Sequence, residues 1–445
     1  MVDAARNLFD AIRTSPLVRL LLIGFLLLVL QIPILMINGQ IGEREERRRT
    51  AVTEVTEKWG KEQTVIGPML TVPYVWRWTE PGEGGKQRIR TEVRHATFLP
   101  DDLTIQGRME SETRYRGIFE VPVYRMTLEV TGRFTKPDFT DWGVDSKEVQ
   151  WDRAALSVRI SDARAIQNQA TLNWNGRDEP FLPGIGEFGG TKPGIHAALK
   201  GRLAGDRFEF SFPLVLNGSD GAFFAPLGQT TTVKVTSNWG NPSFQGNWLP
   251  NDRVVTDKSF EANWSIPHLG RNYPQHWTSD TDLGSVIEAS QFGLRLISPV
   301  DQYRMAHRSM KYEALFLLLT FVSIWLFEVL AKIRVHSIQY LLVGAAMALF
   351  YLLELSLSEH LGFPVTYVIA SAAVVGLISA YSISILKQAK RGAVMGVIVA
   401  ALYGYLYVLL NNEDYALLVG SIGLFLILGL VMYLTRRIDW FAMNK

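Results

Sequence analysis

The stretch Ala416–Leu434 reads ALLVGSIGLFLILGLVMYL and contains no charged side chain. A helix needs roughly 20 apolar residues to cross a hydrocarbon core of about 30 Å. Five other stretches have comparable length and apolar content: Leu17–Ile37, Ala314–Ala331, Ile338–Leu357, Val365–Leu386 and Val394–Leu410. The sequence therefore predicts an integral membrane protein with six transmembrane helices, one near the start of the chain and five bundled at its end.

The first apolar stretch could belong to a cleaved signal peptide or to a retained anchor. Its apolar run is longer than the roughly 7 to 15 residues of a signal-peptide core, and no Ala-x-Ala-like cleavage site follows Ile37. We therefore expect an N-terminal signal-anchor helix at residues 17–37.

The short links between the later apolar stretches alternate in charge. Two links and the tail are basic, whereas the other two links, Ser358–His360 and Asn411–Asp414, are acidic or neutral. The basic residues are Lys332, Arg334, Lys387, Lys390, Arg391, Arg436, Arg437 and Lys445. Basic links stay in the cytoplasm, so we expect cytoplasmic segments at 1–16 and 435–445 and an extracytoplasmic domain at 38–313. The arginines at 44 and 47–49 oppose this orientation, but long domains translocate largely regardless of nearby charge.

The long segment between the first and second apolar helices has the pattern of β-structure. Apolar and polar residues alternate at 124–130, 156–160, 208–216 and 232–235, which is typical of strands with one buried face. Asn217-Gly218 and Pro81-Gly82 are turn signals. We expect a large antiparallel β-rich domain, followed by the five-helix transmembrane bundle at 314–434. A Gly- and Pro-rich stretch at 183–194 would be the boundary if this domain had two lobes.

Two local patterns refine this picture. Glu43–Lys61 is charged, with apolar residues at helical spacing, and could continue the first membrane helix outward. The pair Asn-Trp recurs at 173–174, 238–239, 247–248 and 263–264. We interpret these tryptophans as core residues at strand ends, and a surface that binds glycans or lipid headgroups is the alternative.

Composition and motifs exclude several classes of function. The chain has no cysteine, so disulfides, thiolate catalysis and cysteine zinc sites are absent. A formal net charge of +2 gives no reason to expect nucleic acid binding. Gly184–Gly189 fits G-x-G-x-x-G, but the Gly- and Pro-rich residues that follow favour a loop over a dinucleotide site. We expect no cofactor, no metal site and no enzymatic activity.

Acidic residues within the apolar stretches are the best candidates for function, because charge in hydrocarbon is costly. Glu354 lies in the third helix, and Ser358, Glu359 and His360 follow it. This group is our candidate polar intramembrane site, for an ion, a proton or a lipid headgroup, and a packed protonated glutamate is the structural alternative. Glu328 is explained by its proximity to Lys332, one turn later. Gly392 and Gly396 predict close helix packing.

Several stretches of the chain resemble the CreD family of bacterial inner-membrane proteins. They are Ile66–Pro68 with Val72-Pro73, Ile160–Arg164, Ser237–Trp239 with Pro242–Phe244 and Leu249-Pro250, Pro299–Tyr303, Gln339–Gly344, Phe350–Leu353 with Leu357–His360, and Arg437–Trp440. The resemblance covers nearly the whole chain. It implies a bacterial inner-membrane protein of envelope integrity and stress response, and it names the outer compartment as the periplasm. It supplies no catalytic motif.

Three hypotheses follow. The first is a non-enzymatic envelope protein that is anchored in the lipid bilayer and whose β-rich domain binds a protein, peptidoglycan or lipid partner. The second is a transporter or lipid-handling protein that uses the helical bundle, with Glu354 and His360 at its mouth. The third is an enzyme of the extracytoplasmic domain, for which pairs such as Asp162 and Arg164, or Asp301 and Arg304, are candidates. Structural ion pairs or turn residues are the alternative interpretation of these pairs.

Overall fold

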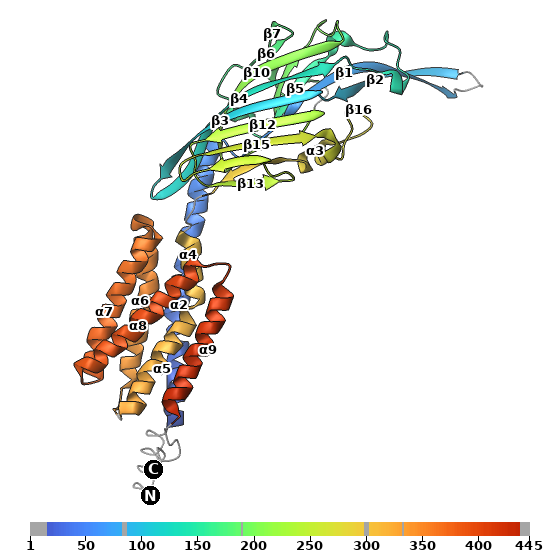
Figure 1. Ribbon diagram of the computed structural model, residues 1–445. Coiled ribbons are helices and arrows are strands. Elements are labelled where there is room, and N and C mark those ends of the chain that lie inside the picture. Colours follow the sequence, from blue (N-terminus) through green and yellow to red (C-terminus); the bar gives the residue numbers. More distant parts are fainter. Residues whose placement is uncertain (1–15, 82–86, 188–189, 298–301, 332, 437–445) are drawn as a thin grey trace. The chain divides into compact units, whose positions relative to one another are not determined.

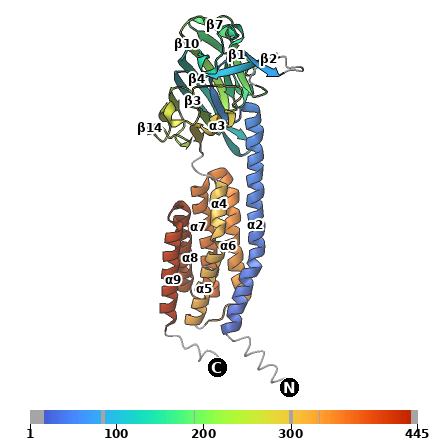
Figure 2. The same cartoon turned by 90° about the vertical axis from the view of Figure 1, so that its right-hand side faces the viewer.

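The computed structural model describes residues 16–81, 87–187, 190–297, 302–331 and 333–436. The chain forms two compact units, shown in Figures 1 and 2. The helical unit comprises Met1–Arg49 and Val300–Lys445, and the β-rich unit comprises Thr50–Pro299. Helix α2 (Pro16–Trp59) contributes residues to both units.

The helical unit contains the six membrane-crossing helices that the sequence predicts. Besides α2 these are α5 (Glu313–Ala331), α6 (Ser337–Leu361), α7 (Phe363–Ile385), α8 (Ala389–Asn411) and α9 (Ala416–Thr435). All six are long and apolar enough to cross a bilayer. Helix α2 continues beyond Ile37 to Trp59, so the helical pattern of the charged segment after the anchor is also confirmed.

Helices α7 and α8 approach closely where α8 begins. A Cβ atom on Gly392 would lie 2.7 Å from the backbone nitrogen of Ile383, and Gly396 leaves no room for a side chain beside Ser379. The close contact predicted from the G-x-x-x-G spacing is confirmed, because the backbone of Ile383 excludes a side chain at Gly392 and the Ser379 side chain fills the space beside Gly396.

The β-rich unit consists of two mixed sheets. The nine-stranded sheet contains β1 (Gln63–Pro81), β2 (Gln87–Phe98), β5 (Ala155–Ile160), β8 (Leu182–Pro183), β9 (Gly194–Ala198), β11 (Gly221–Phe224), β13 (Pro242–Gly246), β16 (His276–Thr278) and β17 (Phe292–Leu296). The eight-stranded sheet contains β3 (Asp102–Arg116), β4 (Phe119–Thr135), β6 (Thr171–Trp174), β7 (Arg177–Pro180), β10 (Arg207–Ser219), β12 (Thr230–Ser237), β14 (Asp252–Val255) and β15 (Phe260–Pro267). A short helix, α3, spans Gly284–Ala289, and 3-10 turns lie at Thr140–Trp142, Trp151–Arg153, Ala163–Ala165 and His268–Gly270.

The strand pairings are mostly antiparallel, as expected, with two exceptions. Strand β1 pairs with β11 in parallel, and β3 pairs with β12 in parallel. The alternation of side chains reports which face of a strand is buried and carries no information on the direction of its neighbour. The four alternating segments noted in the sequence are strands β4, β5, β10 and β12.

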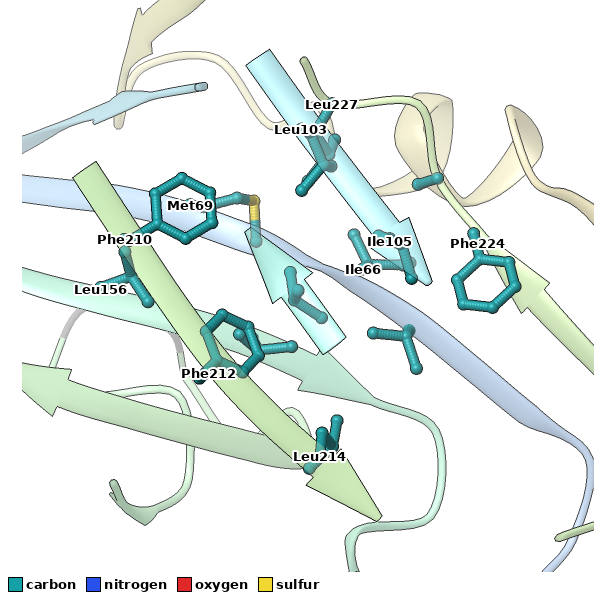
Figure 3. Close-up of a cluster of buried hydrophobic side chains, with 14 of the residues drawn as sticks. Ile66, Met69, Leu103, Ile105, Leu156, Phe210, Phe212, Leu214, Phe224 and Leu227 are labelled. Carbon is teal, nitrogen blue, oxygen red and sulfur yellow. The ribbon is translucent and has the colours of Figure 1, made fainter. Parts of the chain in front are cut away.

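One apolar core lies between the two sheets, as Figure 3 shows. The nine-stranded sheet contributes Ile66, Met69, Leu156 and Phe224, and the eight-stranded sheet contributes Leu103, Ile105, Phe210, Phe212 and Leu214. The tryptophans of all four Asn-Trp pairs pack on this core: Trp174 and Trp264 are buried in it, and Trp239 and Trp248 are partly buried against it. Strands β8 and β9, on either side of the Gly- and Pro-rich stretch, pair with each other.

The turn expected at Asn217-Gly218 is wrong. Both residues lie inside β10, where they pair with Arg125 and Tyr124 of β4. The Tyr124 ring occupies the space that a Cβ atom on Gly218 would need, and the Tyr124 hydroxyl donates a 2.6 Å hydrogen bond to the carbonyl of Gly221. The glycine is therefore required for packing and not for a turn. Pro81 does end β1 opposite Gln87, and residues 82–86 lie outside the described residues.

Besides the short helix α3, two longer segments of the expected β-rich stretch 38–313 are helical in the described residues. Residues 38–59 belong to α2, and Gln302–Lys311 forms helix α4, which belongs to the helical unit. Helix α4 buries Tyr303, Ala306 and Met310 at helical spacing. Its many polar residues explain why a search for long apolar stretches does not detect it.

Candidate functional site

The four residues of the predicted polar site occupy the last two turns of α6. Glu354 and Ser358, one helical turn apart, are both buried, and Glu359 is partly buried. His360 is exposed. The structure therefore places three of the four on the packed side of α6 and leaves His360 outside the group.

Glu354 is enclosed by the helical unit, with 1% of its surface exposed. Ser309 of α4 lies beside its carboxyl group, but Glu354 Oε1 and Ser309 Oγ make no well-formed hydrogen bond within the described structure. Tyr351, Tyr367 and Tyr403 are near enough to interact with the carboxyl electrostatically. The site is thus a carboxyl group among hydroxyl groups, at the meeting point of α4, α6, α7 and α8.

Ser358 is satisfied by its own helix. Its hydroxyl donates a 3.0 Å hydrogen bond to the carbonyl of Leu355. This bond occupies the only proton of the side chain, so Ser358 contributes to packing.

Glu359 joins three helices. The Tyr303 hydroxyl of α4 donates a 2.9 Å hydrogen bond to Glu359 Oε1, and Arg44 Nη1 of α2 lies 3.7 Å from Glu359 Oε2. The carboxylate side chain is only 6% exposed. Burial, together with the neighbouring Glu359 carboxylate, raises the pKa of Tyr303 well above its ordinary value, so the phenol keeps the proton that it donates.

Helices α2 and α4 are also joined directly. Glu45 Oε2 of α2 lies 3.3 Å from His307 Nε2 of α4, and the Arg48 guanidinium lies 5.9 Å from the centre of the Tyr303 ring. We call the group Arg44, Glu45, Tyr303, His307 and Glu359 the junction cluster.

The sequence interpretation missed the partners of Glu354 and Glu359. Ser309 and Tyr303 lie on α4, which falls within the stretch expected to be β-rich. Arg44 enters the sequence analysis as a topology signal and as part of the charged helical segment, and neither role predicts a contact with Glu359. The helical spacing of Tyr303, Ala306 and Met310 was the available signal for α4.

Glu328 differs from Glu354 because its carboxylate is satisfied. It lies near the end of α5 and is 5% exposed. Its Oε1 accepts a hydrogen bond from the backbone nitrogen of Val335 at 3.1 Å, and its Oε2 accepts one from the Tyr340 hydroxyl at 3.2 Å. It therefore fixes the connection between α5 and α6, and its expected neighbour Lys332 lies outside the described residues.

An apolar groove of about 620 Å³ lies between α5, α8 and α9. Its wall includes Leu319 of α5, Ala401 of α8 and Leu426 of α9. A groove with this lining within membrane-crossing helices suits acyl chains. Within the described ranges, no group of three His, Cys, Asp or Glu side chains is arranged to hold a metal ion.

The β-rich unit has one prominent surface feature, a two-stranded arm formed by Trp76–Pro81 and Gln87–Val93. Figure 1 shows β1 and β2 extending beyond the rest of the sheet. Strand β2 pairs with β16 only at Ala96–Phe98, and β1 meets Val149 only at Tyr74. In the described part of the chain, no third strand pairs with the arm. Ile89 and Val93 of the arm are 71% and 46% exposed.

Two comparisons with known proteins cover nearly the whole chain. The family model described as "Inner membrane protein CreD" matches residues 15–441. "Inner membrane protein CreD" of Escherichia coli (strain K12) is 31% identical over 425 residues, which are 95% of this chain and 93% of that protein. These matches include both units, and with the six apolar helices they identify a multi-pass protein of the inner membrane, in contact with the lipid bilayer. The chain belongs to the CreD family of inner membrane proteins.

Proposed function

We propose that this protein supports the integrity of the cell envelope without catalysing a reaction. Its β-rich unit would lie in the periplasm and bind an envelope partner, and its helical unit would anchor that module in the inner membrane. Both chain termini would then lie in the cytoplasm. The alternating charges of the links between the helices support this orientation, and a reporter fused after Lys445 is expected to be cytoplasmic.

The observation that carries the proposal is the arm formed by β1 and β2. Trp76 packs on the core and Arg77 pairs with Glu148 at the base of the arm. Beyond its base the arm is a two-stranded hairpin, and such a hairpin alone is marginally stable in water. Exposed strand edges recruit another polypeptide strand, and exposed apolar residues such as Ile89 and Val93 add contact area. We therefore favour a protein partner over peptidoglycan or lipid, because a protein offers a backbone of strand length that can pair with the arm.

The experiment uses the full-length protein in its native membrane, with a photo-crosslinking amino acid at position 89. Leu269 is the matched control position, because it is 85% exposed and apolar but belongs to the 3-10 turn His268–Gly270 and not to the arm. We expect a cross-linked protein adduct from position 89 and none from position 269.

A second part of the experiment tests function in cells. Cells that lack the gene are complemented with wild type, with the double variant Ile89→Ser/Val93→Ser, or with Leu269→Ser. We expect the double variant alone to lose detergent tolerance while its abundance in the membrane is unchanged. Full tolerance in the double variant, or equal adducts from both positions, would contradict the proposal.

A second candidate function, lipid handling by the helical unit, is favoured by the apolar groove between α5, α8 and α9. Ala401→Trp would fill the groove, whereas Val397→Trp places the same side chain on an exposed part of α8 outside the groove. If the groove holds lipid, Ala401→Trp should reduce the amount of lipid that copurifies with the protein, and Val397→Trp should not. Equal lipid content in both variants would reject this function.

A further inference from the structure

Glu354 is a buried carboxyl group that lacks both a full set of hydrogen bonds and a basic neighbour within the described structure. It is 1% exposed, and its Oε1 has no hydrogen-bond partner within the described structure. No basic side chain of the described residues acts on it. By contrast, Glu328 of α5 and Glu359 of α6 have two partners each.

Every helix packed around Glu354 presents neutral oxygen groups to it. Helix α4 contributes Ser309, α7 contributes Tyr367, α8 contributes Tyr403, and α6 itself contributes Tyr351. A second acid, Glu313 at the start of α5, is near enough to Tyr351 to act on it electrostatically, and it is not among the groups that act on Glu354.

An ionised carboxylate in such surroundings is costly, because hydrocarbon and packed protein do not screen its charge. While Glu354 is buried in the bundle, its carboxylate must therefore be neutralised by a bound cation or proton. Two species fit an environment of oxygen atoms, a proton and an alkali cation.

The backbone geometry favours the proton. Alkali-cation sites within membrane helices use backbone carbonyls that are freed where a helix unwinds. Helix α6 is continuous from Ser337 to Leu361, and Glu354 lies in its interior. Its surrounding carbonyls are therefore used by the helix, and one carboxylate with a few hydroxyls leaves a cation poorly coordinated.

We propose that Glu354 is a proton-binding site of the helical unit, with Ser309 as the positioning residue that orients its carboxyl group. The proton comes from water, forms an O–H bond with the carboxylate and returns to water when the site opens. This inference concerns the bundle and does not depend on the arm or its partner.

Ser309 is suited to this role for two reasons. It is fully buried, and its hydroxyl is unpaired while it lies next to the carboxyl group. A hydroxyl can donate a hydrogen bond to the ionised carboxylate and accept one from the protonated carboxyl group, so Ser309 can hydrogen-bond to Glu354 in either protonation state. Helix α4 also carries Tyr303 of the junction cluster, so movement of α4 would change the surroundings of Glu354 and Glu359 together.

The experiment measures infrared difference spectra of the full-length protein in lipid nanodiscs as the pH is varied. Wild type should show the C=O stretch of a protonated carboxylic acid, which disappears reversibly as the pH rises. Glu354→Gln should lose this component completely. Glu328→Gln is the matched control and should retain it, because it removes a different buried acid of the same unit.

Ser309→Ala provides a test in which Glu354 remains. Orientation by Ser309 predicts that the band persists and that the pH midpoint of its disappearance shifts, and Ser323→Ala on α5 should leave the midpoint unchanged. If Glu354→Gln fails to fold, this pair of variants decides the question.

Three results would overturn the proposal. One is a wild-type band that Glu354→Gln does not remove. Another is a band that stays constant throughout the pH range in which the protein is folded, because Glu354 would then be a permanently neutral packing residue. The third is a carboxylate signal that shifts when Na⁺ replaces choline, which would assign an alkali cation to the site.

Discussion

The hydroxyl group of Tyr303 donates a 2.9 Å hydrogen bond to Oε1 of Glu359, which links α4 to α6. Arg44 of α2 lies 3.7 Å from the other oxygen of the same carboxylate. Helices α2 and α4 therefore both contact one side chain of α6. Glu359 is only 6% exposed, so loss of a partner leaves a buried charge incompletely satisfied.

Tyr303→Phe should therefore destabilise the helical unit by about 1 to 3 kcal/mol, the usual cost of an unsatisfied buried polar group. The measurement is the thermal unfolding of the purified full-length protein in detergent. Tyr415→Phe is the control, because Tyr415 is 64% exposed. In the Glu359→Gln background the cost of Tyr303→Phe should be smaller, because the charge is gone. An equal cost in both backgrounds would show that the hydrogen bond does not carry the effect.

The sequence predicted much of this architecture because its strongest signals are local. Apolar length alone identified the six membrane-crossing helices, and period-two alternation identified strands such as β4 and β10. The parallel pairings of β1 with β11 and of β3 with β12 join segments that are far apart in the chain. No local pattern encodes such pairings.

The candidate site was predicted only in part, for a similar reason. Glu354 was recognisable because an acid in an apolar stretch is conspicuous. Its neighbour Ser309 and the Glu359 partners Tyr303 and Arg44 lie in polar segments, where such residues are ordinary. Only the packing of α2 and α4 against α6 brings them together.

A substitution at Gly218 tests whether this glycine is required for packing against the Tyr124 ring. Gly218→Ala would place a methyl group against the Tyr124 ring inside the sheet pair β4 and β10. Overpacking of this kind typically costs about 1 to 3 kcal/mol. We expect faster limited proteolysis of the β-rich unit in the full-length protein. Gly205→Ala is the control, since its new Cβ would make only ordinary contacts. Equal proteolysis rates in Gly218→Ala and Gly205→Ala would show that the Tyr124 ring does not exclude a side chain at position 218.

Gly392 tests the packing of α7 against α8. Gly392→Leu would force the helices apart, because the obstructing atoms include the backbone nitrogen and Cα of Ile383, which are unable to rotate away. We expect a lower Tm of the full-length protein in detergent. Gly404→Leu lies on the same helix with open space around it. The Tm of that variant should match wild type, and a comparable loss in both variants would mean that leucine itself, and not the contact, is responsible.

The burial of His95 in β2 leads to a prediction of how the stability of the β-rich unit changes in acid. Burial lowers the pKa of His95 from its ordinary value of 6.5. The unfolded chain therefore binds a proton at a higher pH than the folded chain does, and stability falls as the pH drops through about 6.5. Below the folded pKa the loss stops growing, because both states are then protonated. His95→Gln should reduce this acid sensitivity, measured as the change in limited-proteolysis rate of the β-rich unit between neutral and mildly acidic buffer. His268→Gln removes an exposed histidine and should leave the wild-type response intact. If the response of His95→Gln equals that of wild type, the acid sensitivity arises from other groups.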